Sequence, residues 1–299
     1  MTLSPATLSA LAEADLDAEY VAALATAAIE EDLAGGVDVT SVATVPSALS
    51  GTAAFTARGS GVVAGIPVAM VVLDTVGAVE HLSHRTDGSS VTRGDTVLEV
   101  RGPVRILLTA ERSALNLLCH LSGIATLTRQ WADAVASTDA RIRDTRKTTP
   151  GLRLLEKYAV RCGGGVNHRM SLSDAALVKD NHVVAAGGVA AAFAAVRKDF
   201  PDLEVEVECD TVVQVREVVE AGADLVLLDN MSLEDMRAAV EVCRAAGVMT
   251  EASGGLRLDN ALAVAETGVD FLAVGALTHS APVLDLGVDL RLARSGSDA

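Results

Sequence analysis

The stretch from Asp144 to His182 collects side chains that can bind an anion. It contains seven Lys or Arg residues against four Asp or Glu residues, whereas the rest of the chain has 17 against 36. Arginine grips a carboxylate or phosphate at two points with its planar fork, and lysine adds a compact charge. Together these groups could hold a small, multiply anionic substrate. The candidates for that role are Arg146, Lys147, His168, Arg169 and Lys179.

Helical spacing separates a second set of cations within the same stretch. Arg153, Lys157 and Arg161 recur every four residues, the interval that places side chains on one face of a helix. We therefore expect these three to be solvated helix residues. Arg146, Lys147 and Lys179, which stand at the ends of predicted strands, are expected to bind substrate.

Two carboxylates and two glycine turns complete the candidate site. Glu208 and Asp229 end successive predicted strands and could coordinate Mg²⁺ on a diphosphate, directly or indirectly, or stabilise charge at a sugar's anomeric carbon. Each could instead cap the next helix or pair with a neighbouring cation. The turns Ser253-Gly254-Gly255 and Val274-Gly275-Ala276 let backbone N–H groups approach a phosphate, although either could be an ordinary strand-to-helix turn.

The elements that would position these residues form a β/α repeat. From about residue 140, short β-branched runs alternate with amphipathic helical stretches, a pattern typical of parallel strands joined by helical crossovers. Functional residues then gather past the carboxyl ends of the strands. Six strands are too few for a regular eight-stranded barrel, so we expect an incomplete parallel β/α barrel. The predicted strands are Arg141–Asp144, Ala176–Lys179, Leu203–Cys209, Asp224–Leu228, Val248–Ala252 and Asp270–Val274.

The first 110 residues differ in pattern from the rest. A helix over Ala18–Glu31 precedes short alternating runs separated by glycines, which predicts a smaller α+β domain of the open-faced sandwich type with antiparallel strands. Residues Ala110–Ser137 are expected to form a helical linker that is broken near Ser122 and Gly123. The predicted domains are 1–120 and 121–299, and the C-terminal tail could pack back on the first domain.

Composition limits the kinds of partner. A formal net charge of -16 disfavours nucleic acid and anionic membranes, because such a surface repels polyphosphate and acidic lipid. Neither an apolar run long enough to span a membrane nor a secretory signal is visible, so a cytoplasmic protein is expected. The four cysteines are widely spaced, which fits neither a disulfide framework nor a zinc site.

The ordered motifs of the chain closely resemble those of the quinolinate phosphoribosyltransferases, the carboxylating nicotinate-nucleotide pyrophosphorylases. The resemblance extends over nearly the whole chain. It is carried by residues 144–153 (DTRKTTPGLR) and 157–182 (KYAVRCGGGVNHRMSLSDAALVKDNH), together with 111–116, 120–126, 205–208, 228–231, 251–255 and 274–278. One departure lies at Val37, which separates Gly36 from Asp38 where the family usually has adjacent Gly and Asp.

The resemblance implies an activity and a set of roles. The family converts quinolinate and phosphoribosyl pyrophosphate into nicotinate mononucleotide, pyrophosphate and CO₂ with Mg²⁺, in de novo NAD synthesis. It works as a homodimer in which Arg112 is offered to the partner's site. By resemblance, the quinolinate carboxylates are held by Arg112, Arg146, His168, Arg169 and Lys179. Lys147 lies between the two substrates, and Thr145 is a further substrate-binding residue. Glu208 and Asp229 face the ribose and metal, and the two glycine turns bind the 5′-phosphate.

Two alternatives remain open from the sequence. A nicotinate phosphoribosyltransferase would share much of this pattern, but a single carboxylate would leave several site cations unpaired. A non-catalytic protein that binds an anionic metabolite on the same scaffold is the other alternative. The presence of Lys147 beside Glu208 and Asp229, which we take as the catalytic residues, argues against it.

Overall fold

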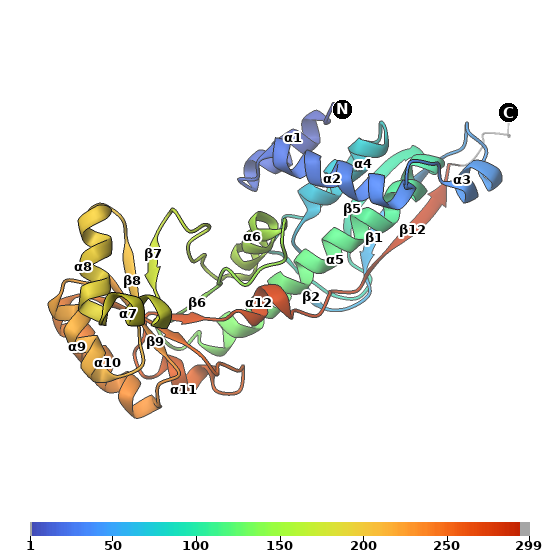
Figure 1. Cartoon of the computed structure of the whole chain (residues 1–299). Coiled ribbons are helices and arrows are strands. Elements are labelled where there is room, and N and C mark those ends of the chain that lie inside the picture. Colours follow the sequence, from blue (N-terminus) through green and yellow to red (C-terminus); the bar gives the residue numbers. More distant parts are fainter. Residues whose placement is uncertain (1, 294–299) are drawn as a thin grey trace. The chain divides into compact units, whose positions relative to one another are not determined.

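The computed structural model of the protein describes residues 2–293, which form two compact units (Figure 1). Unit 1 holds residues 2–126 and 281–293, and unit 2 holds residues 127–280. The sequence placed the boundary between residues 120 and 121 and allowed the C-terminal tail to return. In the structure, β12 (Leu286–Leu292) pairs with β1 (Ser50–Ala57), which explains why residues 281–293 belong to unit 1.

Unit 1 is an α+β unit built on an antiparallel sheet, as the alternating pattern predicted. Its strands lie in the order β12-β1-β5-β3, with β5 at Thr96–Pro103 and β3 at Glu80–His84. Helices α1 (Pro5–Glu13) and α2 (Ala18–Leu33) pack on α4 (Ile66–Val76). The remaining elements are α3 (Val39–Thr44), β2 (Gly61–Val62) and β4 (Ser90–Val91). Val37 is 63% exposed, and Asp38 still caps α3, so the extra residue lies in solvent.

A single long helix, α5 (Val104–Ala134), runs from unit 1 into unit 2. The predicted break near Ser122 and Gly123 is wrong. A Cβ on Gly123 would collide with the carbonyl oxygen of Pro282, and the buried Ser122 hydroxyl bonds both the N–H and the C=O of Ala64. These small residues therefore mark close packing on a continuous helix.

Unit 2 is built on a six-stranded parallel sheet in the order β6-β11-β10-β9-β8-β7. The end strands β6 and β7 are not paired with each other among the described residues, so the β/α barrel is incomplete. This confirms the predicted fold class. The strands are β6 (Arg141–Arg143), β7 (Ala176–Val178), β8 (Val205–Cys209), β9 (Leu225–Asp229), β10 (Met249–Ser253) and β11 (Phe271–Ala273).

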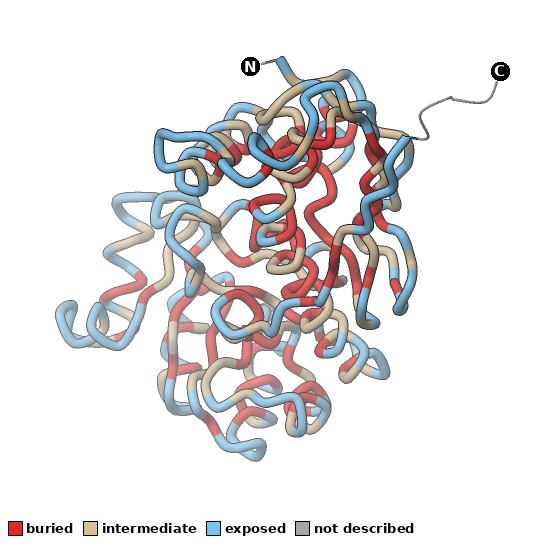
Figure 2. The backbone as a smooth tube through the Cα atoms, turned by 90° about the vertical axis from the view of Figure 1, so that its right-hand side faces the viewer, coloured by how far each residue is buried: buried red, intermediate tan, exposed pale blue. Residues whose placement is uncertain are grey.

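Local signals set the helices of unit 2. Thr211 and Gln214 form a capping box at the start of α9 (Val212–Glu220), and Gly247 ends α10 (Leu233–Ala246) in the left-handed conformation. Buried backbone runs through the interior of each unit, and exposed backbone marks the outer turns (Figure 2). No helix of the described residues is long and apolar enough to cross a membrane. The helices are α6 (Arg153–Gly163), α7 (Asp180–Ala186), α8 (Val189–Asp199), α9 (Val212–Glu220), α10 (Leu233–Ala246), α11 (Ala261–Ala265) and α12 (Ala276–His279).

Candidate active site

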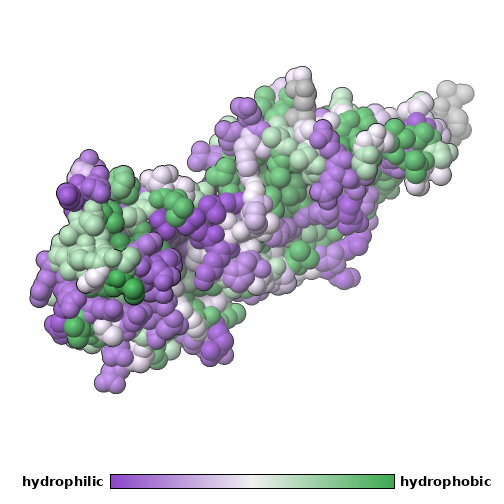
Figure 3. Space-filling view, in the orientation of Figure 1, coloured by the Kyte–Doolittle hydropathy of each residue, from purple (hydrophilic) through white to green (hydrophobic). Residues whose placement is uncertain are grey.

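Apart from Arg112 on α5 and the pair His168 and Arg169 in the loop after α6, the predicted site residues stand at or just past the carboxyl ends of the parallel strands. Several of them line one cavity of about 300 Å³ in unit 2. The strands meet there because parallel neighbours end on the same edge of a sheet. Hydrophilic side chains also gather between α6 and β7 on the face seen in Figure 3. The cavity is lined by Thr145, Arg146, Lys147, His168, Arg169, Leu177, Lys179, Leu227, Glu251, Ser253 and Ala273.

Two guanidinium groups of this cavity keep unused donors. The Nε atoms of Arg146 and Arg169 are buried and have no hydrogen-bond partner among the described residues. Burial, and then the neighbouring charge of Arg146, lower the pKa of Arg169. A buried donor without a partner is costly, and an anion bound in the cavity would remove that cost. The site is therefore suited to a carboxylate or phosphate.

Glu208 and Asp229 lie on the neighbouring strands β8 and β9, and neither is among the residues that line the cavity. Lys179 Nζ is 3.3 Å from Glu208 Oε2, so the pairing with a neighbouring cation that the sequence left open occurs in this structure. Asp229 Oδ2 accepts a 2.6 Å hydrogen bond from the Asn230 side chain. The Lys179 side chain is 51% exposed, so it can leave Glu208 without disturbing the fold. Both acidic residues are partly exposed.

The two glycine turns differ in their surroundings. Gly254 has φ +82°, and a Cβ there would collide with the Asn230 side chain. A Cβ on Gly275 would lie 2.9 Å from Lys147 Cδ. Val274 and Ala276 flank Gly275 at the start of the short α12, whereas α11 begins only at Ala261, several residues after Gly255. Only the second turn therefore leads directly into a helix.

The structure contradicts the interpretation of Lys157 as a solvated helix residue. We expected a solvated cation, but the side chain is fully buried and its Nζ lies 2.5 Å from Asp144 Oδ1. Burial raises the pKa of Asp144 and lowers the pKa of Lys157, so each charge depends on the other. Of its two helical neighbours, Arg161 is exposed as expected, whereas Arg153 is half-buried and donates to Thr148 Oγ1 and to the Met170 carbonyl. The helical interval located these side chains but could not tell which face was covered.

A layer of acidic residues around His168, of which Glu251 itself lines the cavity, was missed by the sequence reasoning. His168 Nε2 lies 2.7 Å from Glu206 Oε2 and 3.7 Å from Glu251 Oε1, and Arg143 donates to Glu251 Oε2 at 2.9 Å. His168 Nδ1 accepts a hydrogen bond from the Arg169 backbone N–H, so the ring proton lies on Nε2 and is donated to Glu206. The signal for this layer was Val205-Glu206-Val207-Glu208, where two carboxylates share one face of a buried strand.

Burial raises the pKa values of Glu206 and Glu251 to about 7. Between about pH 4.5 and 7 the unfolded chain loses these protons while the folded chain keeps them, so the free energy of unfolding falls as the pH rises. In Glu206→Gln, which retains an acceptor for His168, this loss should be reduced. Between pH 5 and pH 8, the free energy of unfolding of the variant should rise by about 2 kcal/mol relative to that of the unaltered protein.

Urea unfolding at several pH values measures this shift. The exposed Glu217 on α9 provides a matched control, and Glu217→Gln should follow the unaltered protein at every pH. Parallel stability curves for Glu206→Gln and the unaltered protein would show that Glu206 titrates normally.

Arg112 is the one predicted site residue that belongs to unit 1. It lies on α5 and is exposed. The other predicted residues all lie in unit 2.

Comparison with known proteins gives a consistent result over both units. Residues 38–122 match the family described as quinolinate phosphoribosyl transferase, N-terminal domain, and residues 124–289 match its C-terminal domain. The chain is 51% identical, over 92% of its length and 99% of the relative, to a nicotinate-nucleotide pyrophosphorylase [carboxylating] from Mycobacterium leprae. A probable enzyme of the same name from Bacillus subtilis is 43% identical over 72% of this chain and 74% of the relative.

Solved structures show the same similarity. NadC from Streptococcus pyogenes superimposes with a TM-score of 0.89 at 38% identity, covering 93% of this chain and 99% of that chain. The nicotinate-nucleotide pyrophosphorylase from Francisella tularensis gives 0.88 at 36% identity, covering 92% and 98%. Human nicotinic acid phosphoribosyltransferase gives 0.61 at 14% identity, covering 85% and 72%, a likeness of fold alone.

Proposed function

The chain belongs to the quinolinate phosphoribosyltransferase family, and from that premise we propose how its residues carry out the family's reaction. The enzyme transfers the phosphoribosyl group of phosphoribosyl pyrophosphate to quinolinate with loss of CO₂. The products are nicotinate mononucleotide, pyrophosphate and CO₂, in de novo NAD biosynthesis. The observation that supports a dicarboxylate substrate best is the cavity with two buried, unpartnered guanidinium donors.

Quinolinate is proposed to bind with its two carboxylates against Arg146, Arg169 and Lys179. A single carboxylate would leave at least one of these charges unpaired in a partly buried site, which favours quinolinate over nicotinate. The resemblance also implied that His168 holds a carboxylate. Both of its ring nitrogens are hydrogen-bonded within the protein. We therefore propose that His168 lines the cavity as a neutral imidazole and does not bind a substrate carboxylate. Burial, which lowers the pKa of His168, supports the neutral form.

Phosphoribosyl pyrophosphate is proposed to bind on the side of Glu208 and Asp229. Their carboxylates offer the hard oxygen ligands that Mg²⁺ prefers, and among the described residues their only charged contact is the half-exposed Lys179. Mg²⁺, when bound, would neutralise charge on the diphosphate. The turns Ser253–Gly255 and Val274–Ala276 are proposed to bind the 5′-phosphate through backbone N–H groups. Thr145 supports this side by accepting from the Lys147 backbone N–H.

The reaction needs positioned charge more than a covalent nucleophile. Pyrophosphate leaves the ribose with the electrons of the broken C–O bond, and the ring nitrogen of quinolinate forms the new C–N bond. Glu208 and Asp229 stabilise the positive charge on the sugar, while Lys147 faces the anions on both sides. The positive ring nitrogen then stabilises the electron pair left on the ring carbon when CO₂ departs, and a proton takes the place of the carboxylate. No further organic cofactor is required.

We further propose that the working enzyme is a homodimer that shares its sites. Arg112 is exposed on unit 1, whereas the cavity is formed by unit 2, and the resemblance assigns Arg112 to the partner's site. A planar guanidinium from the partner would add a further charge for a substrate carboxylate.

An assay with two labelled acids tests the function. The protein is incubated with Mg²⁺, phosphoribosyl pyrophosphate and either quinolinate or nicotinate, and both nucleotide and CO₂ are measured. Equal amounts of nucleotide and CO₂ are expected from quinolinate, with no nucleotide from nicotinate. Nucleotide formation from nicotinate without CO₂ would indicate the alternative transferase, and binding without turnover would indicate a non-catalytic protein.

A further inference from the structure

The ammonium group of Lys157 binds the backbone of the segment that forms one wall of the cavity. Besides the contact with Asp144, Nζ donates to the carbonyl oxygen of His168 at 2.7 Å and to that of Arg169 at 3.0 Å. The three donors of a lysine are therefore all used. Two of them bond the backbone of residues whose side chains line the cavity.

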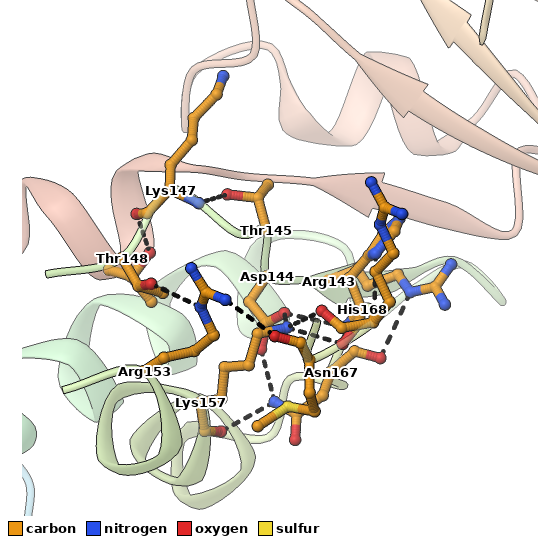
Figure 4. A network of polar contacts seen from close by, with 12 residues as sticks. Arg143, Asp144, Thr145, Lys147, Thr148, Arg153, Lys157, Asn167 and His168 are labelled. Carbon is orange, nitrogen blue, oxygen red and sulfur yellow. Dashed lines mark hydrogen bonds and ion pairs between the residues drawn. The ribbon is translucent and has the colours of Figure 1, made fainter. Parts of the chain in front are cut away.

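Asp144 completes the arrangement from the other side of the same segment. Its Oδ1 accepts the backbone N–H of His168 at 2.9 Å, and its Oδ2 accepts the Asn167 side-chain amide at 2.5 Å. Asp144 directly follows β6, and Lys157 lies on α6, so the pair ties a strand end and a helix to one loop. Figure 4 shows these bonds converging between Asp144, Lys157, Asn167 and His168. We call these four residues the Asp144–Lys157 cluster.

The chain just before residue 167 of the Asp144–Lys157 cluster turns back tightly and brings the loop beside α6. Gly164 ends α6 in the left-handed conformation with φ +95°. A Cβ on Gly165 would lie 2.7 Å from Val160 Cγ1, so the chain turns back tightly against α6. Val166 then forms a bridge with Arg143 of β6. The glycine run therefore returns residues 167–169 beside Lys157 in a defined path.

Stability alone is a poor explanation for this ion pair. Removing two charges from water is costly, and apolar residues of similar volume often stabilise a core equally well. The direction of the bonds is more informative, because they hold the His168–Arg169 backbone rather than the body of α6. Displacing that backbone by a fraction of an ångström would misdirect the Arg169 guanidinium, which is itself steadied by its 2.7 Å bond to the Ala175 carbonyl.

We propose that Lys157, paired with Asp144, is a positioning residue that sets the quinolinate end of the site. It acts through the backbone of His168 and Arg169 and does not touch the substrate. This inference rests on the proposed function for its choice of substrate. The described contacts include no hydrogen bond between the Asp144–Lys157 cluster and the phosphoribosyl pyrophosphate side of the site. That side is formed by Glu208, Asp229 and the glycine turns.

The test compares Lys157→Met with the double variant Asp144→Asn/Lys157→Met. The single variant leaves the Asp144 carboxylate buried without its cation and should lower the unfolding temperature. The double variant removes both charges and should recover most of that loss. In both variants the KM for quinolinate should rise about tenfold or more, while the KM for phosphoribosyl pyrophosphate changes by less than about twofold. Quinolinate binding measured by calorimetry should weaken in parallel.

Lys198→Met on the exposed end of α8 serves as the matched control and should change neither quantity. A double variant that regains both stability and the normal quinolinate KM would overturn the proposal, because the pair would then serve folding alone. Equal rises in both KM values, or failure of both variants to fold, would also count against it. Absence of quinolinate turnover in the unaltered protein would instead contradict the proposed function.

Discussion

Replacing Lys147 with alanine is expected to abolish product formation and leave the fold intact. The Lys147 side chain is exposed and makes no hydrogen bond or ion pair among the described contacts. Its backbone is held independently, since the N–H donates to Thr145 Oγ1 and the carbonyl accepts from Thr278 Oγ1. In Figure 4 the Lys147 side chain extends away from the Asp144–Lys157 cluster. Alanine therefore removes a cation without removing a structural contact.

The size of the effect follows from the charge that Lys147 would stabilise. Groups aimed at charge that develops in a transition state are commonly worth about 10²–10³ in kcat, and a full cation facing pyrophosphate should lie at or above the upper end. Turnover is measured as nucleotide formed per enzyme, and thermal unfolding is followed alongside. Lys198→Ala, which removes an exposed lysine far from the strand ends, should match the unaltered protein. Near-normal turnover by Lys147→Ala would count heavily against the mechanism.

The second large effect is expected at Arg112. Arg112→Ala should lower kcat/KM for quinolinate by about 10²-fold or more, because a bidentate charged contact to a carboxylate would be lost. Stability should change little, since the side chain is exposed on α5. Steady-state kinetics with each substrate varied in turn would measure the loss, and unfolding curves would check the fold. The neighbouring Arg105, which bonds the carbonyls of Val42 and Val45, is an unsuitable control because its loss would disturb α3.

Mixed dimers decide whether Arg112 serves its own chain or the partner's. When Arg112→Ala and Lys147→Ala subunits are exchanged in equal amounts, about half of the dimers are hybrids with one intact site each. Activity should then recover to about a quarter of that of the unaltered protein, although each variant alone is nearly inactive. No recovery after confirmed exchange would place Arg112 in the site of its own chain and contradict the shared-site proposal.

Much of the fold was accessible from periodicity. The six parallel strands of unit 2 lie where the sequence pattern predicted them. The signal is clearest in β9, which is buried and apolar over most of its length, as a strand covered on both faces is expected to be. Helix α10 is likewise bounded by local signals, with Ser232 and Gly247 as caps. The interruption expected in α5 was wrong because Ser122 and Gly123 respond to contacts with Ala64 and Pro282, which lie far away in the sequence.

The candidate site was predictable to the extent that it depends on strand ends. Once a strand is located, the residues at its carboxyl end are known to lie at the functional edge of the sheet, and this rule alone assigned Arg146, Lys179 and Glu208 to that edge. Lys157 was misread because helical spacing puts it in line with Arg153 and Arg161 and says nothing about what covers that face. Only the return of residues 167–169 beside α6 buries it.

The sequence by itself thus determined the family, the β/α order and the set of cations, since these depend on residue types and on short, regular intervals. Tertiary structure decided which charges are paired, buried or available. Asp144 and Lys157 became a buried pair, His168 became a hydrogen-bond partner of Glu206, and the Nε donors of Arg146 and Arg169, two residues that line the cavity, were left without partners among the described residues. The physical reason is that desolvation and hydrogen bonding depend on neighbours brought together by folding, and no local interval in the chain specifies them.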